Sequence, residues 1–156
     1  MLNTVYVLVG MPGVGKSTWI NKNYPHLPVV SSDNFIDLMA RRQGKTYNEV
    51  FQQYIKSALA LVWHDIDRYV TDGTSFIVDQ TNMRTGKRRE ILSKIPADWS
   101  CVAVVFEQPP ENIHTERLAS HPGKVIPAHV LTSMTNGYER PEFTEGFNEI
   151  RYVRTW

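Results

Sequence analysis

The segment GMPGVGKST, residues 10–18, lies directly after the apolar run TVYVLV and directly before the helix-like run WINKN. It fits the pattern G-x-x-x-x-G-K-[ST], in which glycines let successive backbone N–H groups turn inward around an anion at the start of a helix. The pattern needs a strand before it and a helix after it, and both are present here. A strand, a glycine-rich loop and a helix must therefore follow one another at the start of the fold.

This segment predicts a site for a nucleoside triphosphate. The Lys16 ammonium is expected to reach the β- and γ-phosphates, and the Ser17 hydroxyl is expected to ligate Mg²⁺. The residues expected to bind the nucleotide are Gly10, Gly13, Val14, Gly15, Lys16, Ser17 and Thr18. A glycine turn without a ligand is the structural alternative, which the flanking strand and helix disfavour.

Five short runs rich in β-branched residues are separated by helix-like segments. The expected strands are residues 4–9, 27–31, 75–79, 101–106 and 148–153. Near-continuous Val and Ile runs are typical of strands buried on both faces, and helices between them imply a parallel sheet. The expected helices include residues 48–70, 84–95, 111–120 and 127–136, the last with Pro127 in its first turn. The sequence predicts an α/β fold of the P-loop NTPase type, with a five-stranded parallel sheet flanked by helices.

Length and composition set limits on the kind of protein. The length of 156 residues fits one domain, residues 1–156, because domains of about 100–200 residues are usual. The net charge of +1 provides no global attraction for a polyanion, which would need a local basic patch. The single cysteine, Cys101, excludes an internal disulfide and suits the reducing cytoplasm, where we expect the protein. The apolar runs fall short of the roughly 20 residues that span a bilayer, so we expect no membrane partner.

Two acidic residues follow predicted strands, Asp33 in SSDNF and Asp79 in SFIVD. The carboxyl ends of parallel strands meet at one edge of the sheet, beside the phosphate loop. We expect Asp79 to ligate Mg²⁺ and Asp33 to accept the proton of a hydroxyl that attacks the γ-phosphoryl group. The alternatives are a helix N-cap role for Asp33 and a strand-end cap for Asp79.

Residues 114–126, HTERLASHPGKVI, form a predicted lid with a Pro-Gly break. Kinases that lack an external arginine donor often carry one on a lid, which closes over the triphosphate and excludes water. We expect Arg117 to contact the triphosphate and to stabilise the charge of the transition state. For Arg117, His121 and Lys124 alike, the alternative is a solvated surface side chain.

Three further features bear on the substrate. The basic run RTGKRRE, residues 84–90, either contacts acceptor phosphates or forms a solvated helix face. Asn82 either bonds substrate or holds its loop. The one Asn-Lys pair, Asn21-Lys22, lies too early for a guanine-reading N-K-x-D segment, which favours phosphoryl transfer to an organic hydroxyl over GTP hydrolysis.

Four segments resemble the kinase domain of bacteriophage-type polynucleotide 5′-hydroxyl kinases: GMPGVGKSTW, SSDNF, FIVDQTNMRTGKRR and RLASHPGKVIPAHVLTSM. The resemblance spans nearly the whole chain. VDQTN and the ending YERPEFTEGFNEIRYV are also similar to a wider set of small predicted P-loop kinases, some of them attached to RNA-associated proteins. The resemblance implies an adenylate-kinase-like sheet, ATP and Mg²⁺ as the donor system, and transfer of the γ-phosphate to the 5′-hydroxyl of DNA or RNA.

The resemblance also implies roles for single residues. At matching positions, Lys16 and Ser17 fall in the phosphate loop, Asp33 on the general base and Arg117 on a lid arginine. These roles agree with those expected from the strand ends and the lid.

Two positions depart from the phage-type pattern. Ile36 stands where those enzymes have an arginine that holds the acceptor's phosphate, and His121 replaces a second lid arginine. Arg41 and Arg42 lie one to two helical turns further on, where a side chain need not reach the same phosphate. Three hypotheses therefore stay open: a polynucleotide 5′-kinase, a kinase of a small hydroxylated molecule or nucleotide, and an ATP-binding interaction module with little catalysis.

Overall fold

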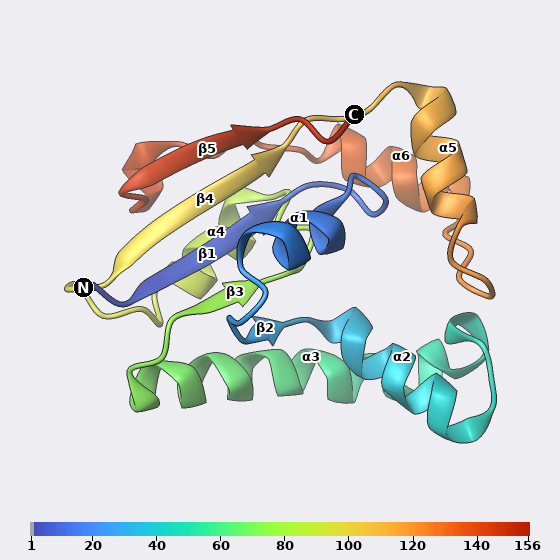
Figure 1. The fold of residues 1–156 in the computed structure, drawn as a ribbon, viewed down its shortest axis with the longest axis horizontal. Coiled ribbons are helices and arrows are strands. Elements are labelled where there is room, and N and C mark those ends of the chain that lie inside the picture. Colours follow the sequence, from blue (N-terminus) through green and yellow to red (C-terminus); the bar gives the residue numbers. More distant parts are fainter. Residues whose placement is uncertain (1) are drawn as a thin grey trace.

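In a computed structural model, residues 2–156 form a five-stranded sheet with helices packed on both faces (Figure 1). The strands are β1 (Thr4–Val9), β2 (Val29–Val30), β3 (Phe76–Val78), β4 (Ser100–Phe106) and β5 (Glu149–Val153). The helices are α1 (Lys16–Asn23), α2 (Ser32–Gln43), α3 (Tyr47–Asp72), α4 (Thr85–Leu92), α5 (Glu111–Ala119), α6 (Ala128–Asn136) and the 3-10 turn η1 (Phe143–Glu145). The sheet order is β2-β3-β1-β4-β5, and all neighbouring strands are parallel. The predicted fold class is confirmed.

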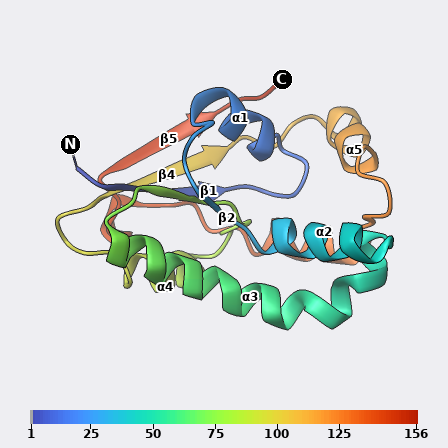
Figure 2. The same cartoon turned by 60° about the horizontal axis from the view of Figure 1, so that its bottom comes forward.

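Strand β1 illustrates why the strands are continuous apolar runs rather than alternating ones. Val5 and Val7 belong to a core cluster that includes residues of α3 and α4, whereas Leu8 belongs to a cluster that includes α1. Figure 2 shows α1 on one face of the sheet and α3 and α4 on the other. Because each face has its own helical layer, apolar side chains are favourable on both sides of the strands.

Helices α2 and α3 form a hairpin below the edge of the sheet (Figure 1). Gly44 ends α2 with φ of 61°, a conformation that glycine adopts without strain, and Thr46 begins α3 in a capping box with Glu49. A small apolar cluster joins the two helices; it contains Ile36, Ala40, Tyr47, Val50 and Ala58. This cluster holds the first turns of α2 and α3 in fixed positions beside the carboxyl ends of the strands.

Several element ends differ from the sequence expectation. β2 is only two residues long because the Ser31 hydroxyl accepts a hydrogen bond from the Asn34 N–H and starts α2 at once. α4 ends at Leu92 rather than at residue 95, and Pro127 precedes α6 rather than lying in its first turn. No helix within residues 2–156 has the length and hydropathy of a membrane-crossing segment.

Candidate active site

The loop between β1 and α1 requires glycine at two positions. Gly13 (φ 80°) and Gly15 (φ 101°) have a left-handed backbone conformation that other residues rarely adopt. A Cβ at Gly13 would lie 3.0 Å from Leu118 Cδ2, and one at Gly15 would lie 3.0 Å from Thr155 Cβ. The shape of the phosphate loop is therefore tied to α5 and to the segment after β5.

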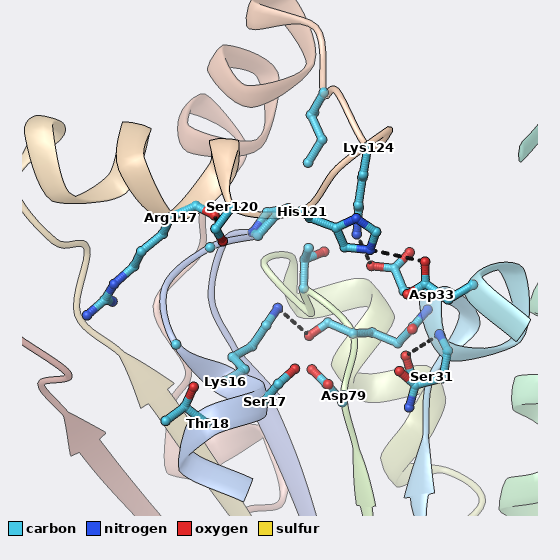
Figure 3. Close-up of a pocket in the computed structure, with 18 of the residues that line it drawn as sticks. Lys16, Ser17, Thr18, Ser31, Asp33, Asp79, Arg117, Ser120, His121 and Lys124 are labelled. Atoms are coloured by element: carbon cyan, nitrogen blue, oxygen red, sulfur yellow. Dashed lines mark hydrogen bonds and ion pairs between the residues drawn. The ribbon is translucent and has the colours of Figure 1, made fainter. Parts of the chain in front are cut away.

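Lys16 begins α1, and its ammonium extends back across the loop (Figure 3). Nζ donates hydrogen bonds to the Gly10 carbonyl at 2.8 Å and to the Gln80 carbonyl at 3.4 Å. Burial lowers the pKa of Lys16, and the carboxylates of Asp79 and Asp33 oppose this effect. The ammonium is thus held at the carboxyl edge of the sheet by neutral carbonyls, which the oxygens of a bound phosphate can replace.

Ser17 and Asp79 carry the oxygens predicted to ligate Mg²⁺, and Figure 3 shows the two side chains pointing toward each other. Burial raises the pKa of Asp79, Lys16 lowers it, and no hydrogen bond from another described residue reaches its carboxylate. Mg²⁺ in phosphate sites commonly takes one or two protein oxygens together with phosphates and water. The pair fits that ion, whereas no group of three or more His, Cys, Asp or Glu among residues 2–156 could hold a metal by itself.

Asp33 lies in the first turn of α2, but it is not the helix cap. Ser31 caps the helix through the Asn34 N–H, so the Asp33 carboxylate is free to face the cavity. Its Oδ1 accepts a hydrogen bond from the Tyr47 hydroxyl at 2.6 Å, and its Oδ2 accepts one from Lys124 Nζ at 2.7 Å. Burial alone would raise the pKa of Asp33, but Lys124 and Tyr47 outweigh burial and lower it below the usual value.

A cavity of about 1330 Å³ joins these groups. Its volume exceeds the roughly 300–1,000 Å³ of a typical small-ligand pocket, so it has room for a nucleotide and a second substrate. The predicted site residues that line it are Gly13, Gly15, Lys16, Ser17, Thr18, Asp33, Asp79 and Arg117. Gly10 and Val14 are instead buried parts of the loop itself, and their carbonyls accept hydrogen bonds from Lys16 and Arg117.

Arg117 lies near the end of α5, and its guanidinium points away from Lys16 (Figure 3). Nη1 donates to the Val14 carbonyl at 3.1 Å and to Thr155 Oγ1 at 2.7 Å, and Nη2 donates to the Thr155 carbonyl at 2.8 Å. In this arrangement Arg117 joins α5, the phosphate loop and the segment after β5. The predicted contact with a transferred phosphoryl group would require the guanidinium to turn away from Thr155.

We expect Arg117→Ala to weaken ATP binding by about 10- to 100-fold. The three hydrogen bonds of Arg117 hold the phosphate loop in the shape that binds phosphate, and a hydrogen bond to a charged group contributes about 1.5–3 kcal/mol. Thr155→Val removes one of the same bonds and should give a smaller loss. The measurement is the dissociation constant of ATP by calorimetry beside the rate of a single turnover. Unchanged ATP affinity with slow transfer in Arg117→Ala would assign the arginine to the transition state instead.

Residues 5–141 match the family model of the AAA domain, which covers most of the chain. The chain belongs to the AAA domain family.

Solved structures with the same fold include several kinases. A proposed kinase from Chloroflexus aurantiacus is 18% identical with a TM-score of 0.70, and the match covers 99% of this chain and 89% of that one. A chain of the Pnkp1/Rnl/Hen1 RNA repair complex is 21% identical with a TM-score of 0.65, over 87% of this chain and 44% of that one. Shikimate kinase from Acinetobacter baumannii is 14% identical with a TM-score of 0.57, over 100% and 86%. These similarities establish the P-loop kinase fold.

In this AAA domain, His114 supports the phosphate loop, a role that sequence reasoning missed. Its Nε2 lies 2.7 Å from the Pro12 carbonyl, and its Nδ1 lies 3.0 Å from the Gln108 amide. Because a carbonyl can only accept, Nε2 carries the proton in this arrangement. A single histidine without a partner at a fixed spacing has no pattern that would reveal it in the sequence.

The segment after β3 has structural roles. Asn82, with φ of 48°, donates its side-chain amide to the Leu8 carbonyl at 2.8 Å and thereby holds its own loop. Arg88 was expected on a solvated or phosphate-binding face, and this expectation was wrong for it: its side chain is fully buried and bonds Glu145 through two nitrogens. The run 84–90 does not line the large cavity.

The two departures from the phage-type pattern differ in their surroundings. Ile36 is fully buried in the cluster between α2 and α3, so its side chain does not face the cavity. His121 does line the cavity, and its Nε2 lies 3.1 Å from the Asp37 carboxylate. Arg41 and Arg42 are exposed and are not part of the cavity wall.

Proposed function

We propose that this AAA domain is an ATP-dependent phosphotransferase that moves the γ-phosphate of ATP to a hydroxyl group. The observation that carries the proposal is that the Asp33 carboxylate opens into the same cavity as Lys16, Ser17 and Asp79. A carboxylate across from a phosphate loop suits a general base for an attacking hydroxyl. The P-loop kinase fold of the neighbouring structures supports the same class of reaction.

Each residue has a defined task in this proposal. Lys16 binds the β- and γ-phosphates through its charge, and Asp33 accepts the proton of the acceptor hydroxyl. Ser17 and Asp79 hold Mg²⁺, which when bound neutralises phosphate charge. Residues 114–126 are the proposed lid of one kinase domain, residues 1–156.

For the acceptor, we first propose the 5′-hydroxyl of DNA or RNA. The resemblance to polynucleotide kinases and the structural similarity to a chain of an RNA repair complex support this choice. Lys124 also lines the cavity and offers positive charge for an anionic acceptor. A cytoplasmic location, in which the free and buried Cys101 stays reduced, is part of the proposal.

A small hydroxylated molecule is the second candidate, because two observations favour it. Position 36 is an isoleucine that is buried away from the cavity, so it cannot hold an acceptor phosphate as the arginine of the phage-type pattern would. The Asp37 carboxylate lines the same cavity one turn of α2 from Asp33, where it would repel a phosphodiester but not a neutral alcohol. Among the similar structures is a shikimate kinase in complex with shikimate, a hydroxylated small molecule.

The test is transfer of labelled γ-phosphate from ATP with Mg²⁺ to 5′-hydroxyl oligonucleotides, with a panel of sugars, nucleosides and nucleotides in parallel. Label on the oligonucleotide end supports the first acceptor, and label on a small molecule alone supports the second. Only for a polynucleotide acceptor do we expect the acceptor affinity to fall as the salt concentration rises, because binding its phosphates releases counterions. ATP binding without any labelled acceptor would overturn the phosphotransferase and leave an ATP-binding interaction module.

A further inference from the structure

The loop between α5 and α6 is docked onto the first turn of α3. The Asn48 side chain donates to the Val125 carbonyl at 3.0 Å and accepts from the Val125 N–H at 3.1 Å, and the Asn48 N–H donates to the Gly123 carbonyl at 3.0 Å. Gly123 has φ of 75°, and a Cβ there would lie 2.5 Å from Thr46 Cβ. The loop is therefore held by its backbone, against a surface that accommodates only glycine at this contact.

The docked loop places the Lys124 ammonium directly on Asp33 (Figure 3). Nζ lies 2.7 Å from Asp33 Oδ2 and 4.5 Å from the centre of the Tyr47 ring. The Lys124 side chain is only 15% exposed, whereas that of Asp33 is 46% exposed to the cavity. Tyr47 occupies the other carboxylate oxygen, so both oxygens of Asp33 already have hydrogen-bond donors.

A carboxylate in this state is a poor proton acceptor. Lys124 stabilises the ionised form of the carboxylate and takes one of the acceptor positions of Oδ2, the oxygen that Tyr47 does not bond. Proton transfer in a transition state requires the base to lie within hydrogen-bond reach of the proton that it removes. Asp33 becomes a stronger base when one of its two donors leaves, and Lys124 is the donor that belongs to a loop rather than to the helical core.

We propose that Lys124 is the resting counter-ion of Asp33 and that the hydroxyl of the acceptor replaces it. This inference rests on the phosphotransferase function proposed above. Tyr47 stays on Oδ1 and keeps the carboxylate oriented, while Oδ2 takes the acceptor proton. The acceptor oxygen then forms a bond to the γ-phosphorus, the bond from that phosphorus to the β,γ-bridging oxygen breaks, and ADP leaves.

The exchange protects ATP when no acceptor is bound. Water in the cavity meets a carboxylate whose basicity Lys124 lowers, so Asp33 activates it only weakly for attack on the γ-phosphate. An acceptor that fills the cavity makes enough contacts to displace the ammonium, and it meets an exposed base. Lys124 is thus a positioning residue that acts through Asp33 and selects an organic hydroxyl over water.

Other charged and titratable groups surround Asp33 and belong in any test of this pair. They are Lys16 from α1, Asp37 from α2, Tyr47 from α3, Asp79 after β3, and His121 and Lys124 from the docked loop. Among residues 2–156, only Lys124 and Tyr47 bond the Asp33 carboxylate directly, so a substitution at Lys124 isolates one contact.

The activity test compares ATP hydrolysis without acceptor with phosphate transfer in its presence. Lys124→Met keeps the length of the side chain and removes its charge. In this variant we expect the ratio of ATP hydrolysis to phosphate transfer to rise about tenfold, which is less than the 10²–10⁴-fold rate increase typical of general-base catalysis. Adding Asp33→Asn should abolish the rise, and Lys124→Arg should keep the wild-type ratio. Lys45→Met, an exposed lysine outside the cavity, is the matched control.

A second readout needs no activity. The Asp33 carboxyl carbon, followed by NMR through a pH titration of the ATP-free protein, should titrate at lower pH in the wild type than in Lys124→Met. Equal titration, or an unchanged ratio in Lys124→Met while the wild type transfers phosphate, would overturn this inference and leave the proposed function standing. A wild type that phosphorylates no hydroxyl would instead overturn the proposed function, and this inference with it.

Discussion

An Asp33→Asn variant is expected to lose about 10²–10⁴-fold in turnover while it binds ATP with nearly unchanged affinity. The amide keeps the shape of the carboxylate but cannot accept the proton of an attacking hydroxyl. Asp33 lies in α2 and makes its hydrogen bonds to Tyr47 and Lys124 rather than to the phosphate loop. The measurements are kcat with the acceptor that the panel identifies and the dissociation constant of ATP.

Asp37→Asn is the matched variant for this test. It makes the same chemical change one helical turn further along α2, at a carboxylate that lines the same cavity and contacts His121. We expect less than a tenfold change in kcat, because Asp37 has no general-base role in the proposed reaction. Equal losses in the two variants would indicate a general electrostatic effect, and wild-type turnover in Asp33→Asn would remove Asp33 from the chemistry.

The second large effect is expected on stability. Arg88→Met should lower the free energy of unfolding by about 3–5 kcal/mol, since breaking a buried ion pair leaves one charge uncompensated. The Arg88 and Glu145 side chains are 0% and 3% exposed, with Nε 2.7 Å from Oε1. Arg88 also donates to the Asn82 carbonyl at 2.9 Å, so the loop after β3 loses a support. Urea denaturation measures the change.

Two comparison variants distinguish the effect of breaking the Arg88–Glu145 ion pair on stability from the general effect of removing a positive charge. Arg89→Met alters the exposed neighbour on the same helix and should change stability by no more than about 0.5 kcal/mol. Adding Glu145→Leu to Arg88→Met removes the uncompensated charge and should restore part of the loss. A double variant as unstable as Arg88→Met would show that packing around the guanidinium, rather than the buried charge, accounts for the effect.

The same pair predicts a pH dependence with a definite sign. Burial would raise the pKa of Glu145, but hydrogen bonds from Arg88 and from the Glu142 N–H hold it below the usual value. A lowered folded-state pKa stabilises the fold fully above the unfolded value of about 4.3, and this contribution is lost as pH falls through the folded pKa. The stability difference between wild type and Arg88→Met should therefore narrow in acid.

Local patterns were sufficient to predict much of this protein. The Val-rich runs around residues 4–9 and 101–106 indicated strands buried on both faces, and both are central strands of the parallel sheet. The glycine pattern of residues 10–18 indicated the loop and the helix after it, because left-handed backbone at Gly13 and Gly15 is a local requirement. Asp33 and Asp79 were expected at the same edge, and both line the cavity.

The contacts of the cationic side chains followed from no local pattern. Arg88 belonged to a run with the composition of a surface helix, yet it is buried against a residue 57 positions away. Arg117 was expected to contact the triphosphate, and its hydrogen bonds to Thr155 and to the Val14 carbonyl had no signal in the sequence. The sequence expectation for Lys124 included only a lid position or a solvated side chain.

The sequence by itself determined the strands, the phosphate loop and the presence of a carboxylate at the start of α2, because these depend on hydrophobic periodicity and backbone conformation over a few residues. The tertiary structure decided which partner each charge has. Lys124 meets Asp33 across 91 residues only because the loop after α5 docks on α3 through Asn48 and Gly123. The packing of whole helices and loops decides which groups a long charged side chain contacts, and no short segment of the sequence predicts that packing.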